Sequence, residues 1–356
     1  MKLRISLVLL SCLVSVAMGL VLSRGHGSSS AGTKRARPLV GLSMDTLKEE
    51  RWQGDRDIFV KRSGEAGADV LVEAANGDDS RQIKDIEALI SRGVDALVII
   101  PHDGAAMAAG VAKAHEAGIP VLAYDRLITG CDLDIYMTFD NVKVGELQAK
   151  FLADRLAQAG KKRIVRIYGS KTDNNAKLFK EGQDHVLQPL IQSGAIEVVW
   201  EDWAEDWRPE NAKRIANAAI TKAGTFDGIL ASNDGTAGGA IQALTEEGLA
   251  GKVLVTGQDA EVAACQRIVT GTQAMTIYKP LTSLATQAAE LAVKLAQRRP
   301  VIARAEINNG KVEVPSVLLD VVPVTKENMM ETVVKDGFHK EAEIYQGTTN
   351  SPATGH

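Results

Sequence analysis

The residues best suited to chemistry in this sequence are polar side chains that directly follow short apolar runs. A carboxylate accepts hydrogen bonds from neighbouring hydroxyl groups, whereas Arg, Lys and Asn donate with defined geometry. An indole can cover the apolar C–H face of a sugar ring. Strand-end polar residues are Asp125, Arg126, Asn174, Asn175, Asn233, Asp259 and Lys279, and residues that start or precede helices are Arg51, Trp52 and Trp207. This mixture suits a small carbohydrate.

Each of these groups also has a purely structural interpretation, and the residue pattern alone leaves it open. The alternatives are helix caps or surface ion pairs for Asp125, Arg126 and Asp259, an ordinary turn for Asn174 and Asn175, and a solvated hinge residue for Lys279. Trp200 ends an apolar strand and is expected in the core, and Trp203 is consistent with loop packing.

Sequence signatures of enzymes do not occur in the chain. It contains no GxGxxG, GxxxxGK[ST], HExxH or GxSxG motif. The six histidines lack metal-ligand spacing. His102 follows a strand end, and two interpretations are open for it: a residue that lines the cleft or, as we expect, a solvated loop residue. Three cysteines without a CxxC pair argue against a disulfide framework, so Cys131 and Cys265 are expected to be idle thiols. We therefore predict a protein that is not an enzyme and has neither metal nor cofactor.

The elements that position these residues belong to a repeated α/β unit. From Val94 to Arg126 an apolar strand, a helix ended by glycine and a second apolar strand follow one another, and the stretch from Phe226 to Asp259 repeats this order. Apolar strands without polar alternation are typical of a parallel sheet covered on both faces. Ligands bind beyond the carboxyl ends of such strands, where the polar residues stand. The sequence thus predicts two similar α/β halves.

The expected domain organisation follows from these runs. Its parts are a signal peptide or anchor (1–22), a flexible tether (23–37), an N-terminal lobe (38–141 plus 281–318), a C-terminal lobe (142–280 plus 319–343) and a disordered tail (344–356). A long helix over 281–298 is expected to return to the first lobe, and a late strand over 317–324 to cross between the lobes. Separate cores joined by several connectors form a hinge.

The N-terminal stretch and the overall charge bear on location and partners. Lys2 and Arg4 precede an apolar run to Leu22, as in an export signal. That run is also near the lower limit for a membrane span, so an uncleaved anchor stays open. The net charge of −4 over 356 residues gives no sign of the basic surface that binds nucleic acid. This argues against nucleic acid as a partner.

Several stretches together resemble the periplasmic D-xylose-binding proteins of ABC importers. They are Glu50-Arg51-Trp52-Gln53, Val121-Leu122-Ala123-Tyr124-Asp125-Arg126, Phe139-Asp140-Asn141, Asp173-Asn174-Asn175-Ala176-Lys177-Leu178-Phe179, Ala231-Ser232-Asn233-Asp234, Gly257-Gln258-Asp259-Ala260, Tyr278-Lys279-Pro280 and Lys335-Asp336-Gly337-Phe338-His339-Lys340. The resemblance covers nearly all of residues 40–343 and implies a type I periplasmic-binding-protein fold, with two Rossmann-like doubly wound parallel-sheet lobes and a three-crossing hinge.

The resemblance also implies a set of sugar contacts and a role. The implied contacts are Arg51, Trp52, Asp125, Arg126, Asn175, Trp207, Asn233, Asp259 and Lys279. The implied role is capture of D-xylose between the lobes and its delivery to an ABC transporter permease, by a monomer in the periplasm or tethered to the membrane. Alternatives are another aldose (ribose, glucose or arabinose) and a ligand-binding partner of a sensor or chemoreceptor. A repressor would need a DNA-binding helix-turn-helix where the apolar export segment stands.

Overall fold

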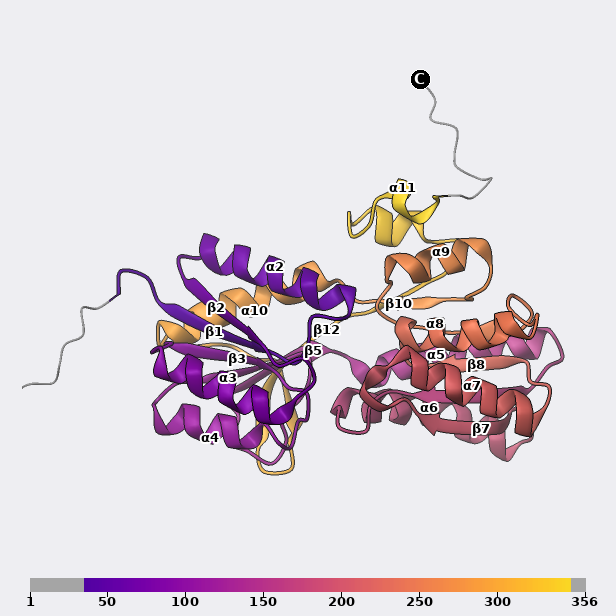
Figure 1. Cartoon of the computed structure of the whole chain (residues 1–356), viewed down its shortest axis with the longest axis horizontal. Helices are drawn as coiled ribbons and strands as arrows, with labels where there is room; N and C mark the ends of the chain where they lie inside the picture. The colour runs from indigo at the N-terminus through magenta and orange to yellow at the C-terminus, as the bar shows by residue number, and fades with distance from the viewer. Residues whose placement is uncertain (1–34, 347–356) are drawn as a thin grey trace, which may run out of the picture. The chain divides into compact units, whose positions relative to one another are not determined.

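The computed structural model describes residues 35–346, of which residues from Pro38 onward belong to one compact unit (Figure 1). The predicted signal peptide, residues 23–34 of the predicted tether and the tail beyond 346 lie outside the described residues. Between residues 35 and 346, every helix is too short or too polar to cross a bilayer.

The first sheet has seven strands in the order β11-β12-β5-β4-β3-β1-β2. Their bounds are β1 (Leu39–Met44), β2 (Asp69–Ala74), β3 (Ala96–Ile100), β4 (Val121–Tyr124), β5 (Ile135–Phe139), β11 (Ala305–Asn308) and β12 (Glu313–Leu319). Every neighbouring pair is parallel except β11 with β12. Strands β3, β4 and β5 are buried throughout, which explains their uninterrupted apolar sequences.

Helices cover both faces of the first sheet. Those of one face are α2 (Glu50–Glu65) and α10 (Leu281–Ala296), and those of the other are α3 (Asp79–Ser91) and α4 (Ala108–Glu116) (Figure 1). Phe59 of α2 and Leu284 of α10 share one core, and Ile86 of α3 and Val111 of α4 share the other. The chain thus returns to this sheet after Pro280, because α10 presents an apolar face to it.

The second sheet has four parallel strands in the order β7-β6-β8-β9. They are β6 (Arg163–Tyr168), β7 (Glu197–Trp203), β8 (Gly228–Ala231) and β9 (Leu254–Val255). Helices α5 (Asn141–Gln158) and α6 (Asn174–Gln192) pack against one face, and α7 (Pro209–Ala223) and α8 (Asp234–Glu246) against the other. Strand register brings the carboxyl ends of β6 and β8 to one edge of this sheet.

A third, two-stranded element joins the sheets, and here the structure corrects the sequence analysis. Strand β10 (Thr276–Tyr278) pairs antiparallel with β13 (Val322–Val324). The single late strand predicted over 317–324 is wrong, because Leu319 pairs with Phe139 in the first sheet whereas Val322 pairs with Tyr278. The chain therefore changes partner at residues 320–321.

The C-terminal end of the described chain packs on the second half. Helix α9 (Val262–Thr270), the π-helical turn η2 (Met330–Val334) and α11 (Glu341–Ile344) share a small core. The predicted start of the tail at Ile344 is wrong for that residue, since its side chain is fully buried in this core. Burial of the apolar Ile344 side chain keeps this residue in the core, although its neighbours in the chain are polar. Cys131 and Cys265 are buried and free, as expected.

Candidate functional site

All nine side chains predicted to contact a sugar line one narrow cavity, whose free volume is about 30 Å³. Four further residues complete the lining: Glu49, Asp173, Phe179 and Gln258. We call this the inner cavity. Its walls come from the ends of β4, β10 and the loops after β6, β8 and β9, so both sheets contribute.

Arg51 lies at the centre of the cavity wall. Its Nη2 is 2.9 Å from Asp125 Oδ1 and its Nη1 is 3.3 Å from Asp259 Oδ1. The guanidinium stacks on Trp52, with Cζ 4.1 Å from the ring centroid. A third carboxylate, Asp55, lies one helical turn further along α2, 3.4 Å from Nε. Arg51 thus holds acceptors from both sheets in place while its planar fork faces the cavity.

Asp125 has a left-handed backbone, with φ of 62°. Its carbonyl oxygen accepts hydrogen bonds from Tyr136 Oη (2.9 Å), Thr138 Oγ1 (2.7 Å) and Asn175 Nδ2 (3.0 Å). Such a conformation is uncommon outside glycine and persists only where surroundings hold it. Three donors from two sheets therefore fix the direction of the Asp125 carboxylate. Asn175 Nδ2 also donates to that carboxylate, at 3.2 Å.

Asp173 is the main site residue that the sequence analysis did not single out. Its Oδ2 lies 3.0 Å from Arg126 Nε and accepts from Trp207 Nε1 at 3.1 Å. Its Oδ1 accepts from the N–H of Asn175 at 2.9 Å and caps α6. The signal available in the sequence was an Asp directly before a helix, a common N-cap. Asn174 and Asn175 open that helix, so the turn alternative is wrong.

Trp207 forms a second aromatic part of the inner cavity's wall. Its backbone is left-handed, with φ of 59°, and its ring lies against the backbone of Gly169. A Cβ atom at position 169 would lie 2.0 Å from Trp207 Cη2. Only glycine therefore allows the ring to take this place. Trp200 packs against the second core, as expected. The loop expected around Trp203 is wrong, because Trp203 ends β7 and packs against Tyr168.

The remaining predicted residues come from the second sheet and the connecting strand. Asn233 caps α8 through a capping box, in which its Oδ1 accepts from the N–H of Thr236 at 2.9 Å. Asp259 follows β9 with φ of 95°. Lys279 is 1% exposed, and its Nζ lies 3.7 Å from Asp259 Oδ1 and 5.2 Å from the ring of Phe179. Lys279 is thus a buried cavity residue and not a solvated one.

Burial and charge perturb the ionisable groups of the inner cavity in opposite directions. Burial would raise the pKa of Asp125, but Arg51, Lys279 and Arg126 outweigh it and lower that pKa below its ordinary value. Burial lowers the pKa of Lys279 despite Asp125 and Asp259. Burial raises the pKa of Asp173, which Arg126 only partly offsets. Asp125 therefore keeps its negative charge more readily than Asp173 does.

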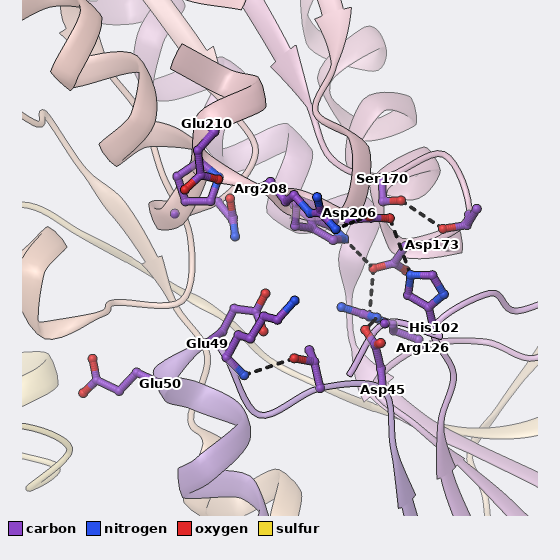
Figure 2. A pocket seen from close by; sticks show the side chains of 18 of the residues that line it. Asp45, Glu49, Glu50, His102, Arg126, Ser170, Asp173, Asp206, Arg208 and Glu210 are labelled. Carbon is purple, nitrogen blue, oxygen red and sulfur yellow. Dashed lines mark hydrogen bonds and ion pairs between the residues drawn. The ribbon is translucent and has the colours of Figure 1, made fainter. Parts of the chain in front are cut away.

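A second, outer cavity shares Glu49, Arg126, Asp173, Trp207 and Asn233 with the inner one. Figure 2 shows Arg126 between Asp45 and Asp173 in this outer cavity, with His102 beside them. The expectation of a solvated His102 is wrong. Its Nδ1 lies 2.9 Å from Asp79 Oδ1 and its Nε2 lies 3.5 Å from Asp206 Oδ1. The long-range fold brings both carboxylates to the ring.

Charged, amide and indole groups converge on the inner cavity. The described residues 35–346 contain no group of three or more His, Cys, Asp or Glu side chains that could hold a metal ion. The cavity offers carboxylate acceptors, amide and cationic donors and two indole faces. This is the chemistry of a carbohydrate-binding site.

Comparison with known proteins agrees with this geometry. A family model described as a periplasmic binding protein domain matches residues 40–300. The chain belongs to the periplasmic binding protein family. The family and the fold class predicted from the sequence are thereby confirmed.

Two relatives of this periplasmic binding protein carry the same name. The D-xylose-binding periplasmic protein of Haemophilus influenzae is 52% identical over 319 residues, which cover 89% of this chain and 95% of that one. The D-xylose-binding periplasmic protein of Escherichia coli is 51% identical over 306 residues, covering 86% and 92%.

A solved structure extends the likeness to the whole fold. A carbohydrate transporter solute-binding protein from Chloroflexus aurantiacus, in complex with D-glucose, has a TM-score of 0.80 and 34% identity, covering 85% of this chain and 97% of that one.

Proposed function

We propose that this periplasmic binding protein captures D-xylose in the inner cavity and delivers it to the permease of an ABC importer. The observation that carries the proposal is the convergence of nine donor, acceptor and indole side chains on one cavity, in a chain 52% identical to a D-xylose-binding periplasmic protein. Binding leaves the sugar chemically unchanged, so the protein is not an enzyme.

In this proposal the side chains divide by chemistry. Asp125 and Asp259 accept hydrogen bonds from paired sugar hydroxyls, and Arg51, Arg126 and Lys279 donate to ring and hydroxyl oxygens. Asn175 and Asn233 make bridging hydrogen bonds with the sugar. Trp52 and Trp207 cover the two faces of the ring. The expected preference for a pentose follows from exclusion of a hydroxymethyl group by Trp207.

Closure of two lobes about a hinge would provide the specificity. The proposed lobes comprise 38–141 with 281–318 and 142–280 with 319–343. The chain passes between the sheets after β5, after β10 and after β12, which supports a three-stranded hinge. A sugar that touches both lobes stabilises only the closed arrangement, and this differential contact drives closure. The closed monomer then presents a joined surface to the permease.

Isothermal titration calorimetry with D-xylose, ribose, glucose and arabinose tests the ligand. We expect D-xylose to bind most tightly with a stoichiometry of one. Recovery of unchanged D-xylose from the complex is expected as well. Tighter binding of glucose contradicts the pentose assignment, and conversion of the sugar contradicts the binding role.

A second candidate is a glucose-binding or broader aldose-binding protein. The Chloroflexus aurantiacus protein was solved with D-glucose, and a relative from Rhizobium radiobacter, 34% identical over 325 residues, is named a multiple sugar-binding periplasmic receptor. The same titrations separate the candidates, since comparable affinities for D-xylose and glucose favour the broader role.

The location and the downstream partner belong to the same proposal. We place the mature protein in the periplasm, exported through residues 1–22, with a membrane tether as the alternative. A sensor or chemoreceptor would use the same cavity with another partner. Deleting the gene separates the roles, because an importer loses D-xylose uptake whereas a sensor loses D-xylose-dependent induction or chemotaxis.

A further inference from the structure

The turn that carries Asp259 has an unusual backbone. Asp259 and Ala260 both have positive φ values, of 95° and 50°. Two consecutive left-handed non-glycine residues cost free energy unless neighbouring groups hold them. The Asp259 carboxylate leaves this turn toward Arg51 and Lys279 and lines the inner cavity. Its direction therefore depends on whatever stabilises the turn.

Asp234 brackets this turn from both sides. Its own N–H donates to the carbonyl oxygen of Gln258 at 2.9 Å. Its carboxylate oxygen Oδ2 accepts from the N–H of Glu261 at 3.0 Å. Gln258 and Glu261 are the residues immediately before and after Asp259 and Ala260. One residue thus binds the chain at the entry and at the exit of the strained turn.

Thr276 of β10 completes this arrangement. Its hydroxyl donates to Asp234 Oδ2 at 2.9 Å and accepts from the N–H of Ala260 at 3.2 Å. The other carboxylate oxygen of Asp234 accepts from Gln273 Nε2 at 2.7 Å, and Gln273 is in turn held by Arg267. Asp234 and Thr276 therefore satisfy the amides of two consecutive residues after Asp259.

Asp234 acts at a distance from the ligand. It is fully buried and does not line either the inner or the outer cavity, although its neighbour Asn233 lines both. The N-terminus of α8 thus carries a cavity residue and, next to it, a residue that binds the turn and its supports without reaching either cavity. A role in direct sugar contact is excluded by this placement.

We propose that Asp234 is a positioning residue that sets the direction of the Asp259 carboxylate and thereby the affinity for the sugar. The proposal rests on the proposed function, because it assumes that Asp259 accepts hydrogen bonds from the ligand. It adds a residue whose effect on binding passes through another side chain. Thr276 shares this role through its hydroxyl.

The electrostatics of Asp234 support this role. Burial raises its pKa to about 7, Arg267 opposes the shift, and nearby Asp259 adds to it. A buried carboxylate of this kind lowers the stability of the fold relative to a neutral side chain. A loss of fold stability of this kind is expected for a residue that supports a functional site. All three side-chain and main-chain partners of its carboxylate are donors.

The first experiment compares Asp234→Ala with Asp234→Asn by titration with D-xylose. Alanine removes the acceptor for the N–H of Glu261, and we expect affinity to fall at least tenfold. Asparagine keeps an oxygen at the Oδ2 position for the N–H of Glu261 and the hydroxyl of Thr276 and disturbs only the contact with Gln273, so affinity should stay within about threefold of the wild type. Equal affinity of the alanine variant, or equal losses in both variants, would overturn the proposal.

Asp227→Ala is the matched control. Asp227 Oδ2 accepts from the N–H groups of Lys162 (3.1 Å) and Arg163 (3.0 Å) at the opposite end of β8. Its loss removes comparable backbone contacts from the same sheet but far from the cavity. We expect lower thermal stability and unchanged D-xylose affinity. A loss of affinity matching that of Asp234→Ala would mean that general destabilisation explains both, and the proposal would fail.

A double-mutant cycle isolates the path through Asp259. In an Asp259→Asn background, Asp234→Ala should change D-xylose affinity less than twofold. The reason is that Asp234 positions the Asp259 carboxylate, and this charge is already absent in Asp259→Asn. Fully additive losses contradict the proposal. Should Asp234→Ala not fold, Thr276→Val replaces it in the cycle, with the same expectations. Absence of binding by the wild type would instead refute the proposed function and is seen before any variant is compared.

Discussion

Arg126 Nε lies 3.0 Å from Asp173 Oδ2, and this ion pair joins the loop after β4 of the first sheet to the first turn of α6 on the second. Both side chains are buried. Two other contacts also cross between the sheets: Arg51 with Asp259, and His102 with Asp206. Opposite charges thus meet at three places where the two halves approach around the cavities.

Removing the Asp173 carboxylate should weaken sugar binding. Asp173→Ala leaves the indole N–H of Trp207 without its acceptor and takes one partner from Arg126. Leaving such buried groups unsatisfied costs about 1–3 kcal/mol each. We expect a loss of about 10- to 100-fold in D-xylose affinity by calorimetry. Asp140→Ala is the control, because Asp140 caps α5 in the same way but is exposed. Equal affinities in the two variants would refute the role of Asp173.

Adding one methyl group at Gly169 should displace Trp207. A Cβ atom there would lie 2.0 Å from Trp207 Cη2, so the ring must move. We expect Gly169→Ala to lower D-xylose affinity about tenfold and to alter the tryptophan fluorescence change on binding. Gly54→Ala in α2 has open space around its Cβ. That control should bind normally and gain up to about 1 kcal/mol of stability. Normal binding by Gly169→Ala would contradict the proposed wall.

Sugar affinity should fall at alkaline pH because of Lys279. Burial lowers the pKa of Lys279, so its ammonium loses the proton at a lower pH than an exposed lysine does. As pH rises through that lowered pKa, the cavity loses a charged donor. Titrations with D-xylose between pH 7 and 10 should show declining affinity in the wild type. Lys279→Met should bind more weakly at pH 7 and with a flatter profile. The exposed Lys150→Met variant should behave as the wild type does. An unchanged alkaline decline in Lys279→Met would count against this explanation.

Stability of the fold should depend on the protonation of His102. Burial lowers the pKa of His102, but Asp79, Asp45 and Asp206 outweigh it and raise the pKa above 6.5. The folded protein therefore holds the proton more tightly than the unfolded chain does. This stabilisation is fully present below pH 6.5 and disappears as pH rises through the raised pKa.

The variant His102→Gln should lose that pH dependence, with an effect of about 1 kcal/mol on the free energy of unfolding at pH 6. Chemical denaturation at pH 6 and pH 8 measures it. The exposed His185→Gln variant is the control and should keep the wild-type difference between the two pH values. A wild-type difference retained in His102→Gln would mean that other groups are responsible.

The residue pattern and the family resemblance together predicted more of the site than the residue pattern did alone. Strand ends identified Asp125, Arg126 and Asn233, because parallel strands place their carboxyl ends at one edge. Positions at or before helix starts identified Arg51, Trp52 and Trp207, and the family resemblance implied a sugar contact for each residue of the set. Their gathering around one cavity agrees with that prediction, whereas their contacts with a sugar stay a prediction.

Asp173 and Asp234 were missed for a physical reason. Each precedes or opens a helix, where an acidic residue normally serves as a cap. What makes Asp173 special is its contact with Arg126 and Trp207, and what makes Asp234 special is its hold on the turn at Asp259. Those partners come from other elements, and helix-start signals carry no information about them. The break at residues 320–321 was missed because both flanking segments are equally apolar.

The sequence by itself determined the local structure: apolar runs that must be buried in parallel sheets, helices with one apolar face, and polar residues at the strand ends. Only the tertiary structure decided which of those polar residues meet, as Arg51 and Asp259 do across 208 positions of the chain. Local propensity and burial act through neighbours in the chain. Pairing of charges depends on the register of sheets and on left-handed turns, which are set by contacts between distant segments.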